Sequence, residues 1–371
     1  MKFKYRRKKE KSKIEKTNME KIEKLANLLV DYSTNVKKRD RVQIVCDYPA
    51  AQLALEIYKY SLQKGANPWI KVDIPGRRYT FYKYSKKQQL LFFPEHEMFE
   101  IKHTDVYIAL RAPTNVKELA SIDPKKISTH MKTLKPITDW RVEKTRWCLF
   151  YYPTEAQAQE AGMSLKEYED FVFNSCFLNW KELSKQMQRI KNKLEKTKVV
   201  EIFGDETQIK FSVEKRKAVV ADGKYNMPDG EVFTSVVENS TNGEIYYEIP
   251  AVYMGNEAEG IRLKFKNGKV VEAKAERGEK FLKQMLSTDA GAKRIGEFGI
   301  GLNYKIKRAV KNILFDEKIG GTIHTALGNG YKETLSKNES AIHWDIIKDL
   351  RKNGEIYFDK ELVMKNGKWL I

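Results

Sequence analysis

Apolar residues follow one pattern in the first half of the chain and another in the second, and the change falls near Val199. In the first half, short apolar runs rich in β-branched residues alternate with stretches in which apolar residues recur every three or four positions. Alternating strands and helices of this kind indicate a parallel sheet that is covered by helices. Strands are expected at 41–48, 67–74 and 105–113.

Helices are expected between these strands and at the end of the first half. The segment 50–66 has helical spacing and ends at Gly65, a typical C-terminal glycine. Another helix is expected to start near Lys16, and the amphipathic segment 164–198 predicts one or two more because it contains neither Pro nor Gly. We therefore expect an α/β amino-terminal domain over 16–198.

After Val199, short runs of alternating apolar and polar residues are separated by Asp-Gly, Asn-Gly or Pro. This pattern predicts antiparallel strands joined by hairpins, and Asn267–Gly268 between two such runs is a strong hairpin signal. We expect an α+β, β-rich domain over 199–371, which would carry the metal site and the catalytic residues.

The composition restricts the classes of protein that fit. Hydrophobic residues make up 41% of the chain, which excludes a wholly disordered protein. The net charge of +19 invites a nucleic-acid partner. However, a basic tail at 1–15 holds much of this excess, and elsewhere Lys alternates with Glu as on solvated helix faces. We expect the tail to be disordered and no specific nucleic acid to bind, although a basic nucleic-acid-binding protein stays open as an alternative.

Cysteine usage and hydropathy indicate a compartment. Cys46, Cys148 and Cys176 are far apart and form no CxxC pair, so a disulfide framework and a thiolate zinc site are not expected. No run approaches the ~18–20 apolar residues of a membrane-spanning helix. We expect a protein of the reducing cytoplasm that has no membrane partner.

Two of the five histidines, His324 and His343, lie in the last fifty residues beside carboxylates. In the sequence His-Trp-Asp, His343 and Asp345 are two positions apart, so on a strand they point to the same side and can converge on one point. Imidazole and carboxylate groups together suit zinc, cobalt or manganese. Taken alone, this pair also fits an ordinary surface or capped histidine.

Three glutamates occur in apolar or glycine-rich surroundings: Glu231, Glu297 and Glu317. Each one alone could be a local cap or turn residue. Together with the two histidines and Asp345 they would be hard to bury separately, because a buried charge is costly unless it is paired or bound to metal. Six such ligands suit two divalent ions with one bridging carboxylate.

The segments that hold these residues resemble the thermophilic metalloaminopeptidase family, of the aminopeptidase T and aminopeptidase S type. The resemblance covers about 17–371 in the family's order, and the basic tail lies outside it. It rests mainly on NMPDGEVFT (226–234), LSTDAGAKRIGEFGIGLN (286–303), LFDEKIGGTIHTALGNGY (314–331) and NESAIHWD (338–345), with YYPTEAQAQEAGMSLKEYEDFVF (151–173) similar to the family's central segment.

The resemblance implies a two-metal aminopeptidase that removes amino-terminal residues from peptides with a free amino terminus. It implies a Rossmann-like amino-terminal domain, a homodimer, and Tyr331 as the residue that stabilises the oxyanion when metal-activated water attacks the scissile carbonyl. Glu297 would bridge the ions and is a candidate to move the proton of the water. The ions would be zinc or cobalt, with manganese or magnesium also possible. Another two-metal hydrolase, such as a phosphoesterase, stays open. The implied metal ligands are Glu231, Glu297, Glu317, His324, His343 and Asp345.

Overall fold

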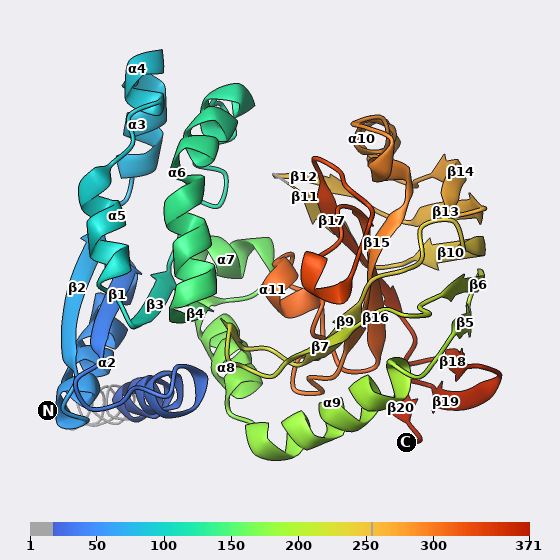
Figure 1. Cartoon of the computed structure of the whole chain (residues 1–371), viewed down its shortest axis with the longest axis horizontal. Coiled ribbons are helices and arrows are strands. Elements are labelled where there is room, and N and C mark those ends of the chain that lie inside the picture. Colours follow the sequence, from blue (N-terminus) through green and yellow to red (C-terminus); the bar gives the residue numbers. More distant parts are fainter. Residues whose placement is uncertain (1–17, 254) are drawn as a thin grey trace, which may run out of the picture. The chain divides into compact units, whose positions relative to one another are not determined.

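The computed structural model describes residues 18–253 and 255–371, so the basic tail expected at 1–15 lies outside the described residues. The chain divides into two compact units (Figure 1). The first unit extends to Phe177 and includes Gly223–Met227, whereas the second comprises Leu178–Asp222 and Pro228–Ile371.

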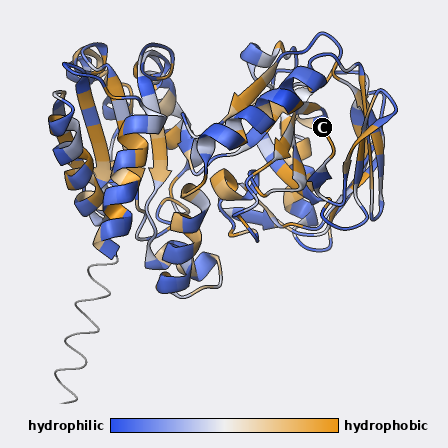
Figure 2. Cartoon of the chain, turned by 90° about the horizontal axis from the view of Figure 1, so that it is seen from below, coloured by the Kyte–Doolittle hydropathy of each residue, from blue (hydrophilic) through white to orange (hydrophobic). Residues whose placement is uncertain are grey.

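The first unit is built on a five-stranded sheet in the order β2-β1-β3-β4-β8, with all strands parallel. The strands expected from the sequence form β1, β2 and β3, and their predicted boundaries are correct to within two residues. Figure 2 shows apolar residues along strands of this unit, and most residues of β1 and β3 are buried, as expected of strands covered on both faces. The strands are β1 (Arg41–Asp47), β2 (Asn67–Asp73), β3 (Val106–Arg111), β4 (Arg146–Tyr151) and β8 (Asn226–Met227).

Helices pack around this sheet. Residues 18–27 are helical and continue into the π-helical η1 (Leu28–Ser33), whereas the expected start near Lys16 lies outside the described residues. The predicted helix at 50–66 is α2 (Ala51–Gln63), which packs on β1 and β2. Within the described ranges, each helix is too short or too polar to cross a bilayer. The remaining elements are η2 (Tyr48–Ala50), α3 (Arg77–Tyr84), α4 (Lys87–Leu90), α5 (Glu95–Lys102), α6 (Pro124–Lys144), α7 (Glu155–Glu160) and α8 (Leu165–Cys176).

The second unit contains an eight-stranded antiparallel sheet in the order β14-β13-β10-β6-β5-β18-β19-β20. The hairpin expected at Asn267–Gly268 joins β13 to β14, and both turn residues have positive φ, at 51° and 79°. The strands are β5 (Val199–Gly204), β6 (Thr207–Ser212), β10 (Asn242–Tyr247), β13 (Ile261–Lys266), β14 (Lys269–Lys274), β18 (Glu355–Phe358), β19 (Glu361–Lys365) and β20 (Lys368–Trp369).

A second sheet of this unit has the order β17-β16-β15-β9-β7 and is antiparallel throughout. Its strands are β7 (Ala218–Ala221), β9 (Glu231–Thr234), β15 (Ile295–Gly301), β16 (Thr322–Gly328) and β17 (His343–Asp349). A small sheet pairs β11 (Ala251–Tyr253) with β12 (Asn256–Ala258). The expected order, an α/β half followed by a β-rich half, is confirmed.

Helix α9 (Trp180–Leu194) explains why the units divide before it. It packs on β7 and β9 and buries Met187 and Ile190 in the apolar core of the second unit. The domain boundary expected after residue 198 stays a prediction about independent folding. The other short elements of this unit are α10 (Glu279–Leu286), η3 (Gly291–Lys293), α11 (Ile313–Asp316) and η4 (Lys332–Thr334).

Candidate metal centre

The five-stranded antiparallel sheet of the second unit, β17-β16-β15-β9-β7, carries five of the six candidate metal ligands on one face. Glu231 begins β9, Glu297 lies in β15 and His324 lies in β16. His343 and Asp345 both lie on β17, two positions apart. Because side chains alternate between the two faces of a strand, this spacing places both of them on the same side.

The register of the strands brings these side chains together. Glu297 pairs with Ala326, and Ala326 pairs with Asp345, so one small residue separates the two acids across the sheet. Gly299 pairs with His324, and a Cβ atom on Gly299 would lie 2.1 Å from the imidazole ring. The small residues on this face therefore leave room for the polar side chains beside them.

Glu317 is the one candidate ligand that lies outside the sheet. It follows α11 directly, and the side chain of Asn312 caps the start of that short helix. Its carboxylate approaches His324 and Asp345, and the three ligand atoms lie within 4.8 Å of one another. The structure thus places all six candidate ligands in one cluster.

Three overlapping groups within the cluster are close enough to hold a cation. In each group, one ligand atom per residue lies within 4.8 Å of the others. The Nε2 atom of His324 is 3.2 Å from Oε1 of Glu297, and Nε2 of His343 is 3.7 Å from its Oε2. The two oxygens of Glu297 therefore face different histidines. The groups are Glu231–Glu297–His324, Glu297–His343–Asp345 and Glu317–His324–Asp345.

Unsatisfied polar atoms show that the cluster fits a metal. Within the described part of the chain, four buried ligand atoms accept or donate no hydrogen bond, and each such atom costs roughly 1–3 kcal/mol. In contrast, Nδ1 of His343 lies 2.7 Å from the carbonyl oxygen of Asn329, which leaves Nε2 as the free ligand atom. The four atoms are Oε2 of Glu231, Oε2 of Glu297, Nδ1 of His324 and Oδ1 of Asp345.

Burial and mutual charge shift the acidity of the cluster. Burial raises the pKa of Glu231 to about 8. Burial alone would lower the pKa of both histidines, but neighbouring carboxylates raise it to about 9 for His324 and about 10 for His343. Burial alone would raise the pKa of Asp345, but the adjacent His343 lowers it to about 2. At neutral pH Glu231 and the two histidines therefore hold protons that a bound cation would displace, whereas Asp345 is ionised.

Lys318 is a charged member of the cluster that the sequence analysis did not identify. Its ammonium group is 1% exposed and contacts Glu231, lies 2.7 Å from Glu317 Oε1 and lies 3.5 Å from Oδ1 of the fully buried Asp229. Burial alone would lower the pKa of Lys318, but these three carboxylates raise it above its ordinary value. Lys318 directly follows Glu317, and Asp229 lies two positions before Glu231, which is the only sequence signal that points to either residue.

Tyr331 lies at the edge of the cluster. Its ring is 5.0 Å from that of His343 and 5.6 Å from that of Phe233, and the residue is 45% exposed. The preceding Gly328 and Gly330 allow a tight path, because a Cβ atom on either would come within 2.5 Å of a backbone oxygen. Partial burial and the nearby carboxylates raise the pKa of the Tyr331 hydroxyl above its ordinary value, so the phenol keeps its proton at neutral pH.

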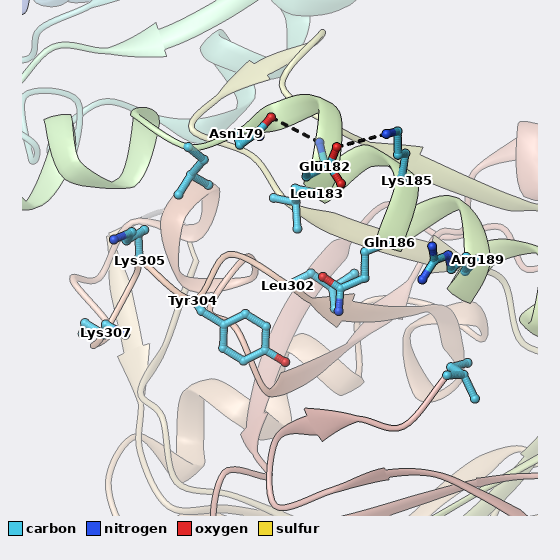
Figure 3. A pocket seen from close by; sticks show the side chains of 12 residues that line it. Asn179, Glu182, Leu183, Lys185, Gln186, Arg189, Leu302, Tyr304, Lys305 and Lys307 are labelled. Atoms are coloured by element: carbon cyan, nitrogen blue, oxygen red, sulfur yellow. Dashed lines mark hydrogen bonds and ion pairs between the residues drawn. The ribbon is translucent and has the colours of Figure 1, made fainter.

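The second unit also has a hollow of about 630 Å³ that lies away from the candidate metal centre (Figure 3). It is formed by α9 and the segment 302–307, and the described residues that line it include neither a candidate ligand nor Tyr331. Two of its charged side chains neutralise each other, since Lys185 and Glu182 lie 3.0 Å apart. The hollow and the candidate metal centre are therefore separate features of this unit.

Comparison with known proteins shows a family match over nearly the whole chain. A family model described as thermophilic metalloprotease (M29) matches residues 18–369. The chain is 26% identical to Aminopeptidase 2 of Geobacillus stearothermophilus over 94% of this chain and 97% of that protein. It is 31% identical to Aminopeptidase T of Thermus thermophilus, over 39% of this chain and 40% of that protein.

A solved structure gives the same fold. Wild-type AmpT from Thermus thermophilus matches with a TM-score of 0.84 at 20% identity, covering 95% of this chain and 100% of that chain. At this identity the likeness concerns the fold alone.

Proposed function

The chain belongs to the thermophilic metalloprotease (M29) family, and on this premise we propose that it is an aminopeptidase whose active site holds two divalent metal ions. As a member of this family it is a metal-dependent enzyme that hydrolyses peptide bonds. The specificity for amino-terminal residues rests on relatives that are named aminopeptidases, one of them similar over 94% of the chain.

The position of the Glu297 carboxylate is the observation that carries the proposal of two ions. One oxygen faces His324 at 3.2 Å and the other faces His343 at 3.7 Å. An imidazole nitrogen binds one ion, whereas a carboxylate can bridge two, so this arrangement fits one ion at each histidine with Glu297 between them. By proximity, the ion at His324 would also bind Glu231 and Glu317. Asp345 lies near both positions, and we assign it to the ion at His343 because its Oδ1 is 3.4 Å from Nε2 of that histidine.

The mixture of nitrogen and oxygen donors favours a metal ion of borderline softness. Imidazole nitrogens suit zinc and cobalt, whereas a set made only of oxygens would favour magnesium or manganese. Two histidines and four carboxylates lead us to propose zinc or cobalt. Metal analysis of the purified protein distinguishes these ions from manganese and magnesium.

The chain's own residues have distinct parts in the proposed reaction. Bound divalent ions lower the pKa of water and polarise a carbonyl group. The Tyr331 phenol donates a hydrogen bond to the carbonyl oxygen as that oxygen gains negative charge. Glu297, or a glutamate that is not assigned to a metal, would accept the proton of the attacking water and deliver it to the leaving amine.

We further propose a cytoplasmic homodimer. The dimer rests on the family resemblance alone, and the molar mass in solution tests it. The compartment is supported by the three cysteines, Cys46, Cys148 and Cys176, which are buried as thiols rather than disulfides, as suits a reducing environment.

A hydrolysis assay tests the proposed function. The protein is freed of metal with a chelator, reloaded with zinc or cobalt, and given an aminoacyl amide that releases a fluorescent amine. We expect release that requires the metal and stops when the substrate's amino group is acetylated. Equal release from the acetylated substrate would contradict an aminopeptidase. Activity on phosphate esters only would favour a phosphoesterase, and salt-sensitive nucleic-acid binding without hydrolysis would favour a binding protein.

A further inference from the structure

The described residues around the candidate metal centre carry more negative charge than its ligands alone. Five buried or nearly buried carboxylates belong to it: Asp229, Glu231, Glu297, Glu317 and Asp345. When all five are ionised, the charge of Lys318 and the four charges of two divalent ions balance them. One positive charge of this balance is thus part of the polypeptide.

Lys318 contacts the proposed ligands of one ion and forms no ion pair with those of the other among the described residues. Lys318 contacts Glu231 and Glu317, the two acids that we assign to the ion at His324. Among the ion pairs of the described chain, Lys318 makes none with His343 or Asp345, which we assign to the other ion. A buried cation repels a second cation nearby more strongly than it would in water.

We propose that Lys318 makes the two metal positions unequal: its ammonium group weakens the ion held by Glu231, Glu317 and His324, which therefore binds second. This inference rests on the two-ion site proposed above. Lys318 acts as a positioning residue, since it also holds one oxygen of Glu231 and leaves the other, Oε2, without a hydrogen-bond partner for the ion.

Titration of the chelator-treated protein with Co²⁺, followed by the absorption of the bound metal, tests the proposal. The wild-type chain should take up two ions in two separate steps. In Lys318→Met, which keeps the length of the side chain but removes its charge, the second step should tighten by at least about tenfold. A structural role would weaken that step instead, so an unchanged or weaker second step overturns the inference.

A charge-restoring variant separates charge from packing. Asp229→Asn in the Lys318→Met background removes one negative charge along with the positive one, so the second step should return toward that of the wild type. Asp229→Asn alone should weaken the second step, and it decides the matter if Lys318→Met does not fold. A tighter second step in Asp229→Asn alone contradicts the proposal.

Lys348 offers a matched control. It is also fully buried, but its ammonium group contacts Glu248 and the carbonyl oxygen of Asp205, on the opposite face of the same sheet. Lys348→Met should leave both cobalt steps unchanged, and a shift equal to that of Lys318→Met overturns the inference. A wild-type chain that binds one ion refutes the two-ion site itself, whereas two ions with steps indifferent to Lys318 refute only this inference.

Discussion

The two faces of the antiparallel sheet β17-β16-β15-β9-β7 differ in chemistry. One face is apolar and belongs to the core of the second unit, with Phe298, Ile300, Ile323, Leu327, Trp344 and Ile346. The other face, made by the alternate residues of the same strands, carries the ionisable cluster and the small residues that separate its members. Neighbouring residues in the sequence thus belong to chemically different environments.

The difference shows what each face needs in order to be stable. The apolar face is stabilised by packing, for example between Phe298 and Phe211, whose ring centroids are 5.1 Å apart. The charged face lacks enough protein cations, because Lys318 is the one buried ammonium that contacts the ligands among the described residues. Substitutions on the first face should therefore change stability, whereas those on the second should change metal binding and rate.

The largest effect is expected from Glu297→Gln. The amide keeps the shape of the side chain but loses the charge that would hold two cations together, so hydrolysis should fall by roughly a thousandfold or more. Circular dichroism should show an intact fold. Near wild-type turnover at full metal occupancy would contradict the role of Glu297 as the bridge.

Tyr331→Phe should have the next largest effect. An oxyanion donor acts in the transition state, so kcat should fall by about 10²–10³-fold while KM changes little. Metal content and Tm serve as controls and should stay close to those of the wild type. A kcat within a few-fold of wild type would remove Tyr331 from the mechanism, and loss of metal would make its role structural.

A pair of adjacent substitutions sharpens the comparison of the faces. In Gly299→Ala, the new Cβ would lie 2.1 Å from the His324 ring, so the ring must move and metal affinity should fall about 10–100-fold. Phe298→Leu on the other face should instead lower the free energy of unfolding by about 1–2 kcal/mol. Metal titration and thermal melting measure both variants, and equal loss of metal affinity in the two would refute the division between the faces.

The smallest effect is expected from removal of residues 1–13. This segment carries a net charge of +7 and precedes the region that matches the family, which begins at residue 18. Hydrolysis by the shortened chain should equal that of the full chain. If truncation abolished activity, the division of the chain into a tail and two domains would need revision.

Local patterns predicted three of the five strands of the first unit's sheet and one hairpin of the second unit. The strands at 41–48 and 105–113 were recognisable because strands that are covered on both faces require continuous apolar runs. The hairpin at Asn267–Gly268 was recognisable because its turn requires positive φ. These features depend on residues that are close in the sequence.

Tertiary contacts account for what the sequence did not reveal. The segment that forms β15 was noted as glycine-rich and was not predicted as a strand, because glycine disfavours strands. In the structure Gly299 makes room for His324, which comes from another strand. Lys318 beside Glu317 has the sequence pattern of a solvated pair, and its burial depends on Asp229 and Glu231, nearly ninety residues earlier.

A crystal structure of the cobalt- or zinc-loaded protein, with the ions located by anomalous scattering, tests the central claim most directly. Two peaks about 3.5–4 Å apart are expected, with Glu297 between them. One peak should lie beside His324, Glu231 and Glu317, and the other beside His343 and Asp345. A single peak in active protein, or ions bound away from Glu297, would contradict the two-metal site.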